Sequence, residues 1–223
     1  MTLKTLYDLF QNHPEGHWII QPPNPQLLYE FVKKHPIKRV LDLGTGIGCS
    51  TAIIALALKH KGETDWHIDT VDQFDKCIKI AKELIPKELQ ENITFHKAEA
   101  VIWQYDKIPH QTFSVYDKLP EGDYDLILND GPSPWLENEC YVELPNATIM
   151  ELLLKGKIKK GCLIAWDGRL LAFGTLERYF SNNFYLFRPA QRNDDFNVLE
   201  RKDNEVQFLD SRLENMKLST YFT

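Results

Sequence analysis

The chain has 223 residues, of which 43% are hydrophobic and 26% are charged, and its formal net charge is −6. These values are ordinary for a soluble globular protein. The acidic balance argues mildly against a nucleic-acid backbone as the main partner, because phosphate binding needs a basic face. No apolar run reaches the roughly 18 residues that span a bilayer, and residues 1–16 lack the apolar core of a signal peptide. Four cysteines without a CxxC pair are typical of reduced thiols in a cytoplasmic protein.

Short apolar runs alternate with helical patterns along the chain, which is typical of a parallel sheet covered by helices. The clearest early helix signal is NPQLLYEFVKKHP, with Asn24 as the N-cap and Pro25 at the first helical position. Up to residue 122 the sequence then predicts a strand at 39–43, a helix at 50–62, a strand at 66–72, a helix at 75–86, a strand from 92 that ends near Ala98, and a helix and a loop within 101–122.

The second half of the chain continues the alternation and ends in two adjacent strands. It predicts a strand at 124–130, a helix at 147–160, a strand at 161–167, a helix at 169–183, and an antiparallel pair at 184–190 and 196–202. Right-handed crossovers turn this order into a single α/β domain with a doubly wound, mostly parallel seven-stranded sheet and a C-terminal antiparallel hairpin. Within this domain, 1–223, residues 1–35 are expected to form a lid and a helix, and residues 36–223 the core.

The stretch VLDLGTGIGCST at residues 40–51 joins an apolar strand, an acid and three alternate glycines. In a doubly wound sheet, ligands bind at the carboxyl ends of the strands, where this loop lies. Gly44, Gly46 and Gly48 allow the backbone to approach a ligand closely, and the following helix N-terminus offers N–H groups to a carboxylate or phosphate. Asp42 suits a ligand with an ammonium group, because a carboxylate at a buried strand end is costly unless it is paired.

Three ligands compete for this loop. A P-loop requires a lysine that is absent here, and a dinucleotide fingerprint requires its third glycine one residue later. S-adenosylmethionine fits better, because its amino-acid carboxylate suits the helix N-terminus and its amine suits Asp42. Its ribose suits Asp72 at the end of the second strand, and its adenine edge suits Glu99 after the third. Taken singly, Asp72 is equally typical of a helix N-cap, and Glu99 of a solvated acid at a helix start.

At these three strand ends the chain resembles the class I S-adenosylmethionine-dependent methyltransferases. LDLGTGIG is similar to the first motif of that family, TVDQF to the segment with its ribose-binding acid, and AEA to its adenine-side motif. LILNDGPSPW and GCLIAWDG look most like segments of small-molecule O-methyltransferases. The resemblance implies a Rossmann-like methyltransferase fold with S-adenosyl-L-methionine as cofactor. It implies cofactor contacts from Asp42, Gly44, Thr45, Gly46, Gly48, Ser50, Asp72, Gln73, Glu99, Ala100 and Asp130.

Asp130 and Asp167 follow the fourth and fifth predicted parallel strands, so both are expected at the same edge of the sheet. They are the predicted catalytic residues, because transfer to a hydroxyl needs a group that removes its proton. Catechol-type members of the resembling family hold a divalent cation with acids at these positions and an asparagine after the second, where this chain has Gly168. Three alternatives stay open at Asp130: a Mg²⁺ ligand, a metal-free general base or substrate orienter, and a structural Asx-turn.

Two segments are candidates for contact with the acceptor. EGHWIIQPP, at 15–23, precedes the helix predicted from Asn24, where related enzymes place a lid. Trp18 is there either a substrate contact or a packed side chain. PSPWLENECYVE offers Trp135 for stacking on a ring, but no residue in it specifies a substrate.

The sequence thus predicts an S-adenosylmethionine-dependent methyltransferase that acts on an oxygen of a small molecule. Two other classes stay open: a non-catalytic subunit that binds S-adenosylmethionine, and an NAD(P)-dependent oxidoreductase, against which the glycine spacing speaks. The expected setting is the cytoplasm, with a small-molecule acceptor, no nucleic acid, no membrane, and either a monomer or a homodimer.

Overall fold

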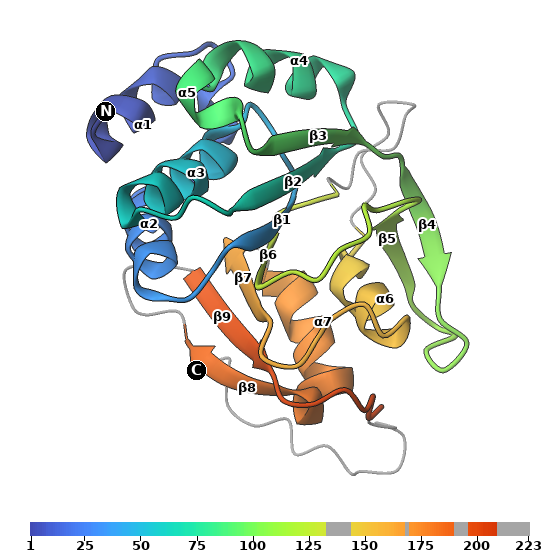
Figure 1. Ribbon diagram of the computed structural model, residues 1–223. Coiled ribbons are helices and arrows are strands. Elements are labelled where there is room, and N and C mark those ends of the chain that lie inside the picture. The colour runs from blue at the N-terminus through green and yellow to red at the C-terminus, as the bar shows by residue number, and fades with distance from the viewer. Residues whose placement is uncertain (133–143, 168–169, 190–195, 209–223) are drawn as a thin grey trace, which may run out of the picture.

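The computed structural model describes residues 1–132, 144–167, 170–189 and 196–208. Its centre is a sheet of seven strands in the order β3-β2-β1-β6-β7-β9-β8 (Figure 1). Neighbouring strands from β3 to β7 are parallel, whereas β9 is antiparallel to both β7 and β8. The predicted sheet and its C-terminal antiparallel pair are confirmed. The strands are β1 (Arg39–Leu43), β2 (His67–Asp72), β3 (Ile93–Lys97), β6 (Leu126–Asn129), β7 (Leu163–Asp167), β8 (Phe184–Arg188) and β9 (Phe196–Arg201).

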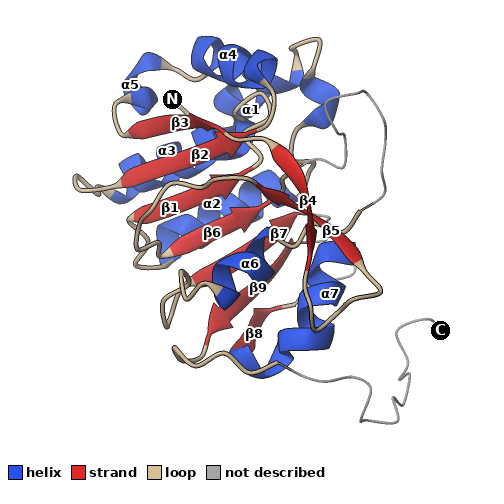
Figure 2. Ribbon diagram, turned by 90° about the vertical axis from the view of Figure 1, so that its right-hand side faces the viewer, coloured by secondary structure: helices blue, strands red, loops and turns tan. Residues whose placement is uncertain are grey.

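Helices cover both faces of this sheet (Figures 1 and 2). One face carries α1, α2 and α3, with α4 and α5 beside them, and the other carries α6, α7 and a small antiparallel pair of strands, β4 and β5. The helices are α1 (Leu3–Gln11), η1 (Gly16–Trp18), α2 (Asn24–Lys34), α3 (Cys49–Lys61), α4 (Asp75–Leu84), α5 (Lys87–Gln90), α6 (Thr148–Leu154), α7 (Leu170–Phe180) and η2 (Ser181–Asn183).

The two faces hold two hydrophobic clusters, and β1 contributes to both. Val40 packs in the cluster under α1, α2 and α3, whereas Leu41 and Leu43 pack in the cluster on the opposite face. Successive side chains of a strand point to opposite faces, so a continuous apolar run such as RVLDL fits a strand that is covered on both sides. This central strand ends at the glycine loop and therefore holds that loop at a rigid edge of the sheet.

The prediction of a helix within 101–122 was wrong. The segment contains β4 (Ala100–Gln104) and β5 (Thr112–Tyr116), paired antiparallel. Phe113 and Val115 of β5 are buried in the cluster that also holds α6 and α7, whereas Val101 and Ile102 of β4 are exposed. Only β5 is buried as a core strand is, whereas β4 is largely exposed. The alternation of apolar and polar residues that predicts a strand is therefore weak in this segment.

Two predicted helix boundaries differ in smaller ways. α2 begins at Asn24, so Pro23 rather than Asn24 is its N-cap residue, and Pro25 lies at the second helical position. α6 ends at Leu154, because Lys155 caps it and the chain turns at Gly156 before it enters β7. The lysine-rich stretch after α6 is therefore a turn and not the last turn of a helix.

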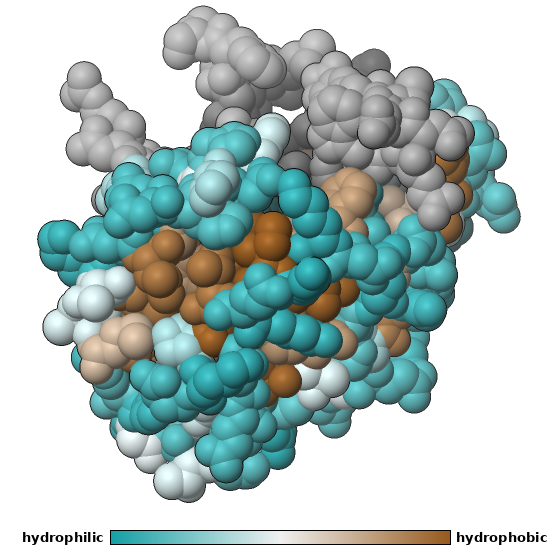
Figure 3. All heavy atoms as spheres, turned by 90° about the horizontal axis from the view of Figure 1, so that it is seen from above, coloured by the Kyte–Doolittle hydropathy of each residue, from teal (hydrophilic) through white to brown (hydrophobic). Residues whose placement is uncertain are grey.

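Viewed from above, the surface shows a central apolar area surrounded by polar residues (Figure 3). None of the helices in the described ranges is both long enough and apolar enough to cross a lipid bilayer.

Candidate functional site

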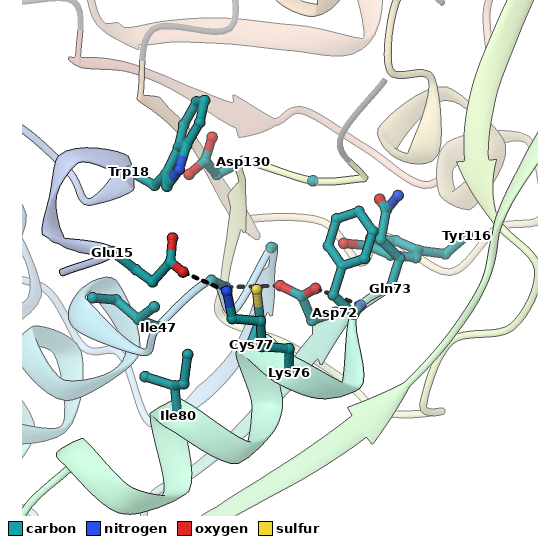
Figure 4. A pocket seen from close by; sticks show the side chains of 14 residues that line it. Glu15, Trp18, Ile47, Asp72, Gln73, Lys76, Cys77, Ile80, Tyr116 and Asp130 are labelled. Carbon is teal, nitrogen blue, oxygen red and sulfur yellow. Dashed lines mark hydrogen bonds and ion pairs between the residues drawn. The ribbon is translucent and has the colours of Figure 1, made fainter. Parts of the chain in front are cut away.

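A cavity of about 280 Å³ opens where β1, β2 and β6 end (Figure 4). This volume is near the lower end of small-molecule sites, which hold roughly 300–1,000 Å³. Its walls come from the loops after these strands, from the start of α4 and from the segment between α1 and α2. The lining residues are Glu15, Trp18, Gly44, Gly46, Ile47, Asp72, Gln73, Phe74, Lys76, Cys77, Ile80, Tyr116, Asp130 and Gly131.

Asp72 ends β2 and connects two walls of this cavity. Its Oδ2 accepts a hydrogen bond from the backbone N–H of Gly46 at 2.7 Å, and its Oδ1 accepts one from the N–H of Phe74 at 2.8 Å. Burial raises the pKa of Asp72 to about 6, the charge of Asp130 adds to the rise, and the backbone N–H groups oppose it. Phe74 is the N-cap residue of α4, and this helix has no side-chain cap, so Asp72 is not its N-cap but holds the chain just before it.

The first two glycines of the loop have different tasks. Gly44 has φ +104°, and a Cβ there would lie 2.8 Å from the carbonyl carbon of Asp130 and from the nitrogen of Gly131. Its missing side chain therefore lets the loop after β1 pack directly on the loop after β6. Gly46 has φ +51°, and a Cβ there would meet no described atom within 4 Å. Gly46 is thus the glycine whose backbone faces open space in the cavity.

Asp42 lies beneath the loop rather than in a cavity wall. Its side chain is fully buried, and its Oδ2 accepts hydrogen bonds from the hydroxyls of Thr51 at 2.6 Å and Ser50 at 3.1 Å. Its Oδ1 has no hydrogen-bond partner among the described residues. Burial raises the pKa of Asp42 to about 7, although these hydroxyls favour the charged form. The predicted contact of Asp42 with a ligand amine therefore stays a prediction.

The remaining predicted residues divide between two neighbouring cavities. Thr45 and Ser50 line a smaller space of about 30 Å³ together with Trp18 and Asp130. Glu99 and Ala100 line a polar cavity of about 280 Å³ on the other side of Gln73 and Phe74. The carboxylate of Glu99 is partly exposed and forms an ion pair with Lys97. Gly48 precedes α3 and faces Ala81 and Ile85, and none of the three cavities includes it.

The structure places Asp130 and Asp167 at equivalent backbone positions. Asn129 of β6 is paired with Trp166 of β7, so the next residue of each strand is the predicted acid. Asp130 is half-buried and lines the main cavity. Gly168 and the segment with Trp135 lie outside the described residues.

Several cavity residues were not predicted from sequence. Glu15 and Lys76 form an ion pair at the cavity wall, joining the segment after α1 to the first turn of α4 (Figure 4). Tyr116 reaches the cavity from the end of β5, and its hydroxyl donates to the backbone oxygen of Val71 at 3.5 Å. The position of Lys76 just after Asp72 was a usable signal, whereas Tyr116 gave none because β5 itself was missed.

The described part of the chain contains no group of three or more His, Cys, Asp or Glu side chains arranged to hold a metal ion. Glu15, Asp72 and Asp130 all line the main cavity, but they do not form such a group among the described residues. The Mg²⁺ alternative is therefore not supported.

Comparisons with known proteins agree with this geometry. The profile of a family described as protein-L-isoaspartate(D-aspartate) O-methyltransferase matches residues 8–117. The SAH-bound methyltransferase PaMTH1 of Podospora anserina has a TM-score of 0.61 at 14% identity, over 90% of this chain and 88% of that chain. The O-methyltransferase of Bacillus cereus in complex with SAH has a TM-score of 0.59 at 14% identity, over 90% of each chain. The O-methyltransferase TomG of Streptomyces achromogenes, in complex with SAM, has a TM-score of 0.57 at 15% identity, over 90% of each chain.

A search of curated protein sequences found no match. The sheet order and the cavity at its carboxyl edge define an α/β protein with the Rossmann-like methyltransferase fold. The fold is shared with SAM- and SAH-bound methyltransferases, and residues 8–117 are similar to one methyltransferase family.

Proposed function

We propose that this chain transfers a methyl group from S-adenosylmethionine to an oxygen atom of a small molecule. The observation that carries the proposal is the buried carboxylate of Asp72, held by the N–H groups of Gly46 and Phe74 in the wall of the main cavity. A carboxylate fixed at the end of the second strand, beside a glycine-rich loop, suits a ligand with vicinal ribose hydroxyls.

The residues around the cavity fit the rest of the cofactor. Gly46 leaves room for close approach of a ligand, and α3 begins directly after the loop with N–H groups that suit a carboxylate. The unpartnered Oδ1 of Asp42 is a buried acceptor that an ammonium group would satisfy. Gln73 and Phe74, which line both larger cavities, are the proposed contacts on the adenine side. When bound, S-adenosylmethionine supplies a methyl group activated by its positively charged sulfur.

For the acceptor, we propose that Asp130 accepts the hydroxyl proton or orients the hydroxyl. It lies in the wall of the main cavity, and its backbone N–H is fixed to the carbonyl of Leu43 at 2.8 Å. We also propose Asp167 as the second catalytic residue, because its backbone occupies the equivalent position on the next strand. Oxygen as the target atom is supported by the O-methyltransferase family match and by the printed names of two similar structures.

The wider setting is proposed on the same basis. A small-molecule acceptor, rather than nucleic acid, fits the acidic net charge of −6. We keep a cytoplasmic location and a single domain over residues 1–223 as parts of the proposal. A homodimer remains the proposed alternative to a monomer.

Isothermal titration with S-adenosylhomocysteine tests the cofactor assignment. Wild-type protein should bind with micromolar affinity, and Asp72→Ala should weaken binding at least about tenfold, which is about 1.4 kcal/mol. Asp65→Ala is the matched control, because Asp65 is exposed and pairs with Arg39 at the other end of the sheet. NADH should not bind.

Absence of binding to the wild type would refute the methyltransferase proposal. Tight binding without methyl transfer to any member of a broad panel of hydroxyl acceptors would instead favour a non-catalytic subunit. Binding of NADH in preference to S-adenosylhomocysteine would favour the oxidoreductase.

A further inference from the structure

Trp18 is the most exposed of the large hydrophobic side chains in the described residues, at 71% of its full surface, yet it lines the main cavity. An indole is a large apolar group that proteins usually bury, at least in part, and exposed aromatic rings beside a cavity are typical of binding sites. The other cavity aromatics, Phe74 and Tyr116, are 38% and 2% exposed. Trp18 is therefore the side chain whose surface a bound ligand would change most.

The exposure of Trp18 does not come from a loosely packed segment. Gly16 is buried just before it, and Ile19 and Ile20 are buried just after it. The hydroxyl of Tyr7 donates to the carbonyl of Ile20 at 3.2 Å, which ties the segment to α1. The indole is thus held out at the cavity by a backbone that is fixed on both sides.

The position of Trp18 separates it from the proposed adenine side. Trp18 and Asp130 line both the main cavity and the small space beside the glycine loop. Gln73, by contrast, lines the main cavity and the polar cavity, but not that small space. Figure 4 shows Trp18 and Asp130 close together at one side of the cavity, and Gln73 and Tyr116 at the other. The indole therefore accompanies the carboxylate proposed to act on the acceptor.

We infer that Trp18 is the stacking platform for the methyl acceptor, and that the acceptor is a planar aromatic hydroxyl compound whose oxygen faces Asp130. This inference rests on the proposed function, because it places an acceptor beside the cofactor in that same site. A flat ring can cover the exposed indole face, whereas a saturated ring offers poorer contact and no offset stacking. The inference narrows the acceptor from any small alcohol to phenol-like compounds.

The test measures binding of matched ring compounds to protein saturated with S-adenosylhomocysteine. The probes are 2-naphthol and phenol, with decahydro-2-naphthol and cyclohexanol as their saturated counterparts. Wild-type protein should bind the aromatic member of each pair at least tenfold more tightly. Trp18→Ala should remove most of that preference, and Trp18→Phe should restore it to within about threefold, because phenylalanine keeps a stacking face.

Trp103→Phe is the matched control, since Trp103 stacks on Tyr105 in the β4–β5 region and lines none of the three cavities. It should leave every affinity unchanged. For any phenol that is methylated, Trp18→Ala should raise KM at least tenfold with little change in kcat, as expected for a residue that only binds the substrate.

Three results would overturn the inference. One is equal affinity of wild type and Trp18→Ala for 2-naphthol, and another is equal affinity of the wild type for the aromatic and saturated probes. The third is a tenfold loss of S-adenosylhomocysteine affinity in Trp18→Ala, which would assign the indole to the cofactor. Failure of the wild type to bind S-adenosylhomocysteine is a separate outcome, because it refutes the proposed function and the inference together.

Discussion

The two ends of the main cavity are built differently. At the end proposed for the ribose, Asp72 is buried and both of its oxygens accept backbone N–H groups. At the other end, Trp18 is mostly exposed and Asp130 is half-buried. The first end is shaped by strand ends and backbone, and the second by side chains from connecting segments.

This difference indicates which end of the cavity is determined by the fold and which end is determined by side chains on connecting segments. The loop after β1 packs through its backbone against the loop after β6, so few side-chain changes are tolerated at this end of the cavity. Exposed side chains on connections can change without disturbing the sheet. The family match over residues 8–117 includes the glycine loop, Asp72 and Trp18, and it ends before Asp130. We therefore expect the fold to determine the cofactor, and the connecting segments to determine the acceptor.

The largest expected effect is a loss of stability in Gly44→Ala, at the end of the cavity that contains Asp72. The new Cβ would meet the backbone of Asp130 and Gly131 at 2.8 Å, and the residue would keep φ near +104°. Strain of about 1–3 kcal/mol and overpacking of about 1–3 kcal/mol should together lower the free energy of unfolding by roughly 2–6 kcal/mol. Urea denaturation measures this loss.

Gly46→Ala is the matched comparison for that experiment. A Cβ there meets no described atom within 4 Å, so only the left-handed φ should cost stability, about 1–2 kcal/mol. Its methyl group would project into the cavity and should weaken S-adenosylhomocysteine binding at least about tenfold. Equal stability losses in the two variants would contradict the assignment of Gly44 to packing and Gly46 to the ligand.

The next effect concerns the buried acid beneath the loop. Asp42 has its pKa raised from 3.8 to about 7, so the folded state holds its proton over a pH range in which the unfolded state has lost it. Stability from this group should therefore fall as pH rises from about 4 to about 7, by at most about 4 kcal/mol at 1.36 kcal/mol per pKa unit. Asp42→Asn, which has no proton to lose, should lack this component.

Urea unfolding of both proteins at pH 5, 6, 7 and 8, without cofactor, measures the difference between them. The stability of the wild type relative to Asp42→Asn should decrease up to about pH 7 and then level off. A difference that is constant with pH would show that Asp42 is already ionised at pH 5.

The smallest expected effect concerns the ion pair between Glu15 and Lys76, which joins the Trp18 segment to α4. The Lys76 side chain is 72% exposed and that of Glu15 is 30% exposed, so solvent screens the pair and Glu15→Gln should change the unfolding midpoint little. It should speed dissociation of S-adenosylhomocysteine, more at low than at high salt, because exposed charges are screened. Stopped-flow chasing measures the rate, and Asp8→Asn, which removes the exposed Lys4 pair on α1, is the control. Identical rates at low salt would mean that this ion pair does not help to retain the ligand.

Local sequence was sufficient to predict the main sheet. The strands β1, β2, β6 and β7 are short apolar runs between helical patterns, and right-handed crossovers join them into one mostly parallel sheet. The same reasoning led to Asp72 and Asp130, because residues that end parallel strands must meet at one edge. These features depend on periodicity and chain direction, which neighbouring residues determine.

Tertiary structure decided the features that depend on distant contacts. Phe113 and Val115 of β5 are buried in the hydrophobic cluster that also contains residues of α6 and α7. The sequence of residues 101–122 does not show that these helices would cover the strand. Glu15 meets Lys76 across sixty-one positions of the chain, and Trp18 reaches the edge at which Asp130 lies. The sequence by itself determined the sheet and the cofactor loop, because both follow from local pattern. Only the packing of remote segments decided which side chains complete the cavity.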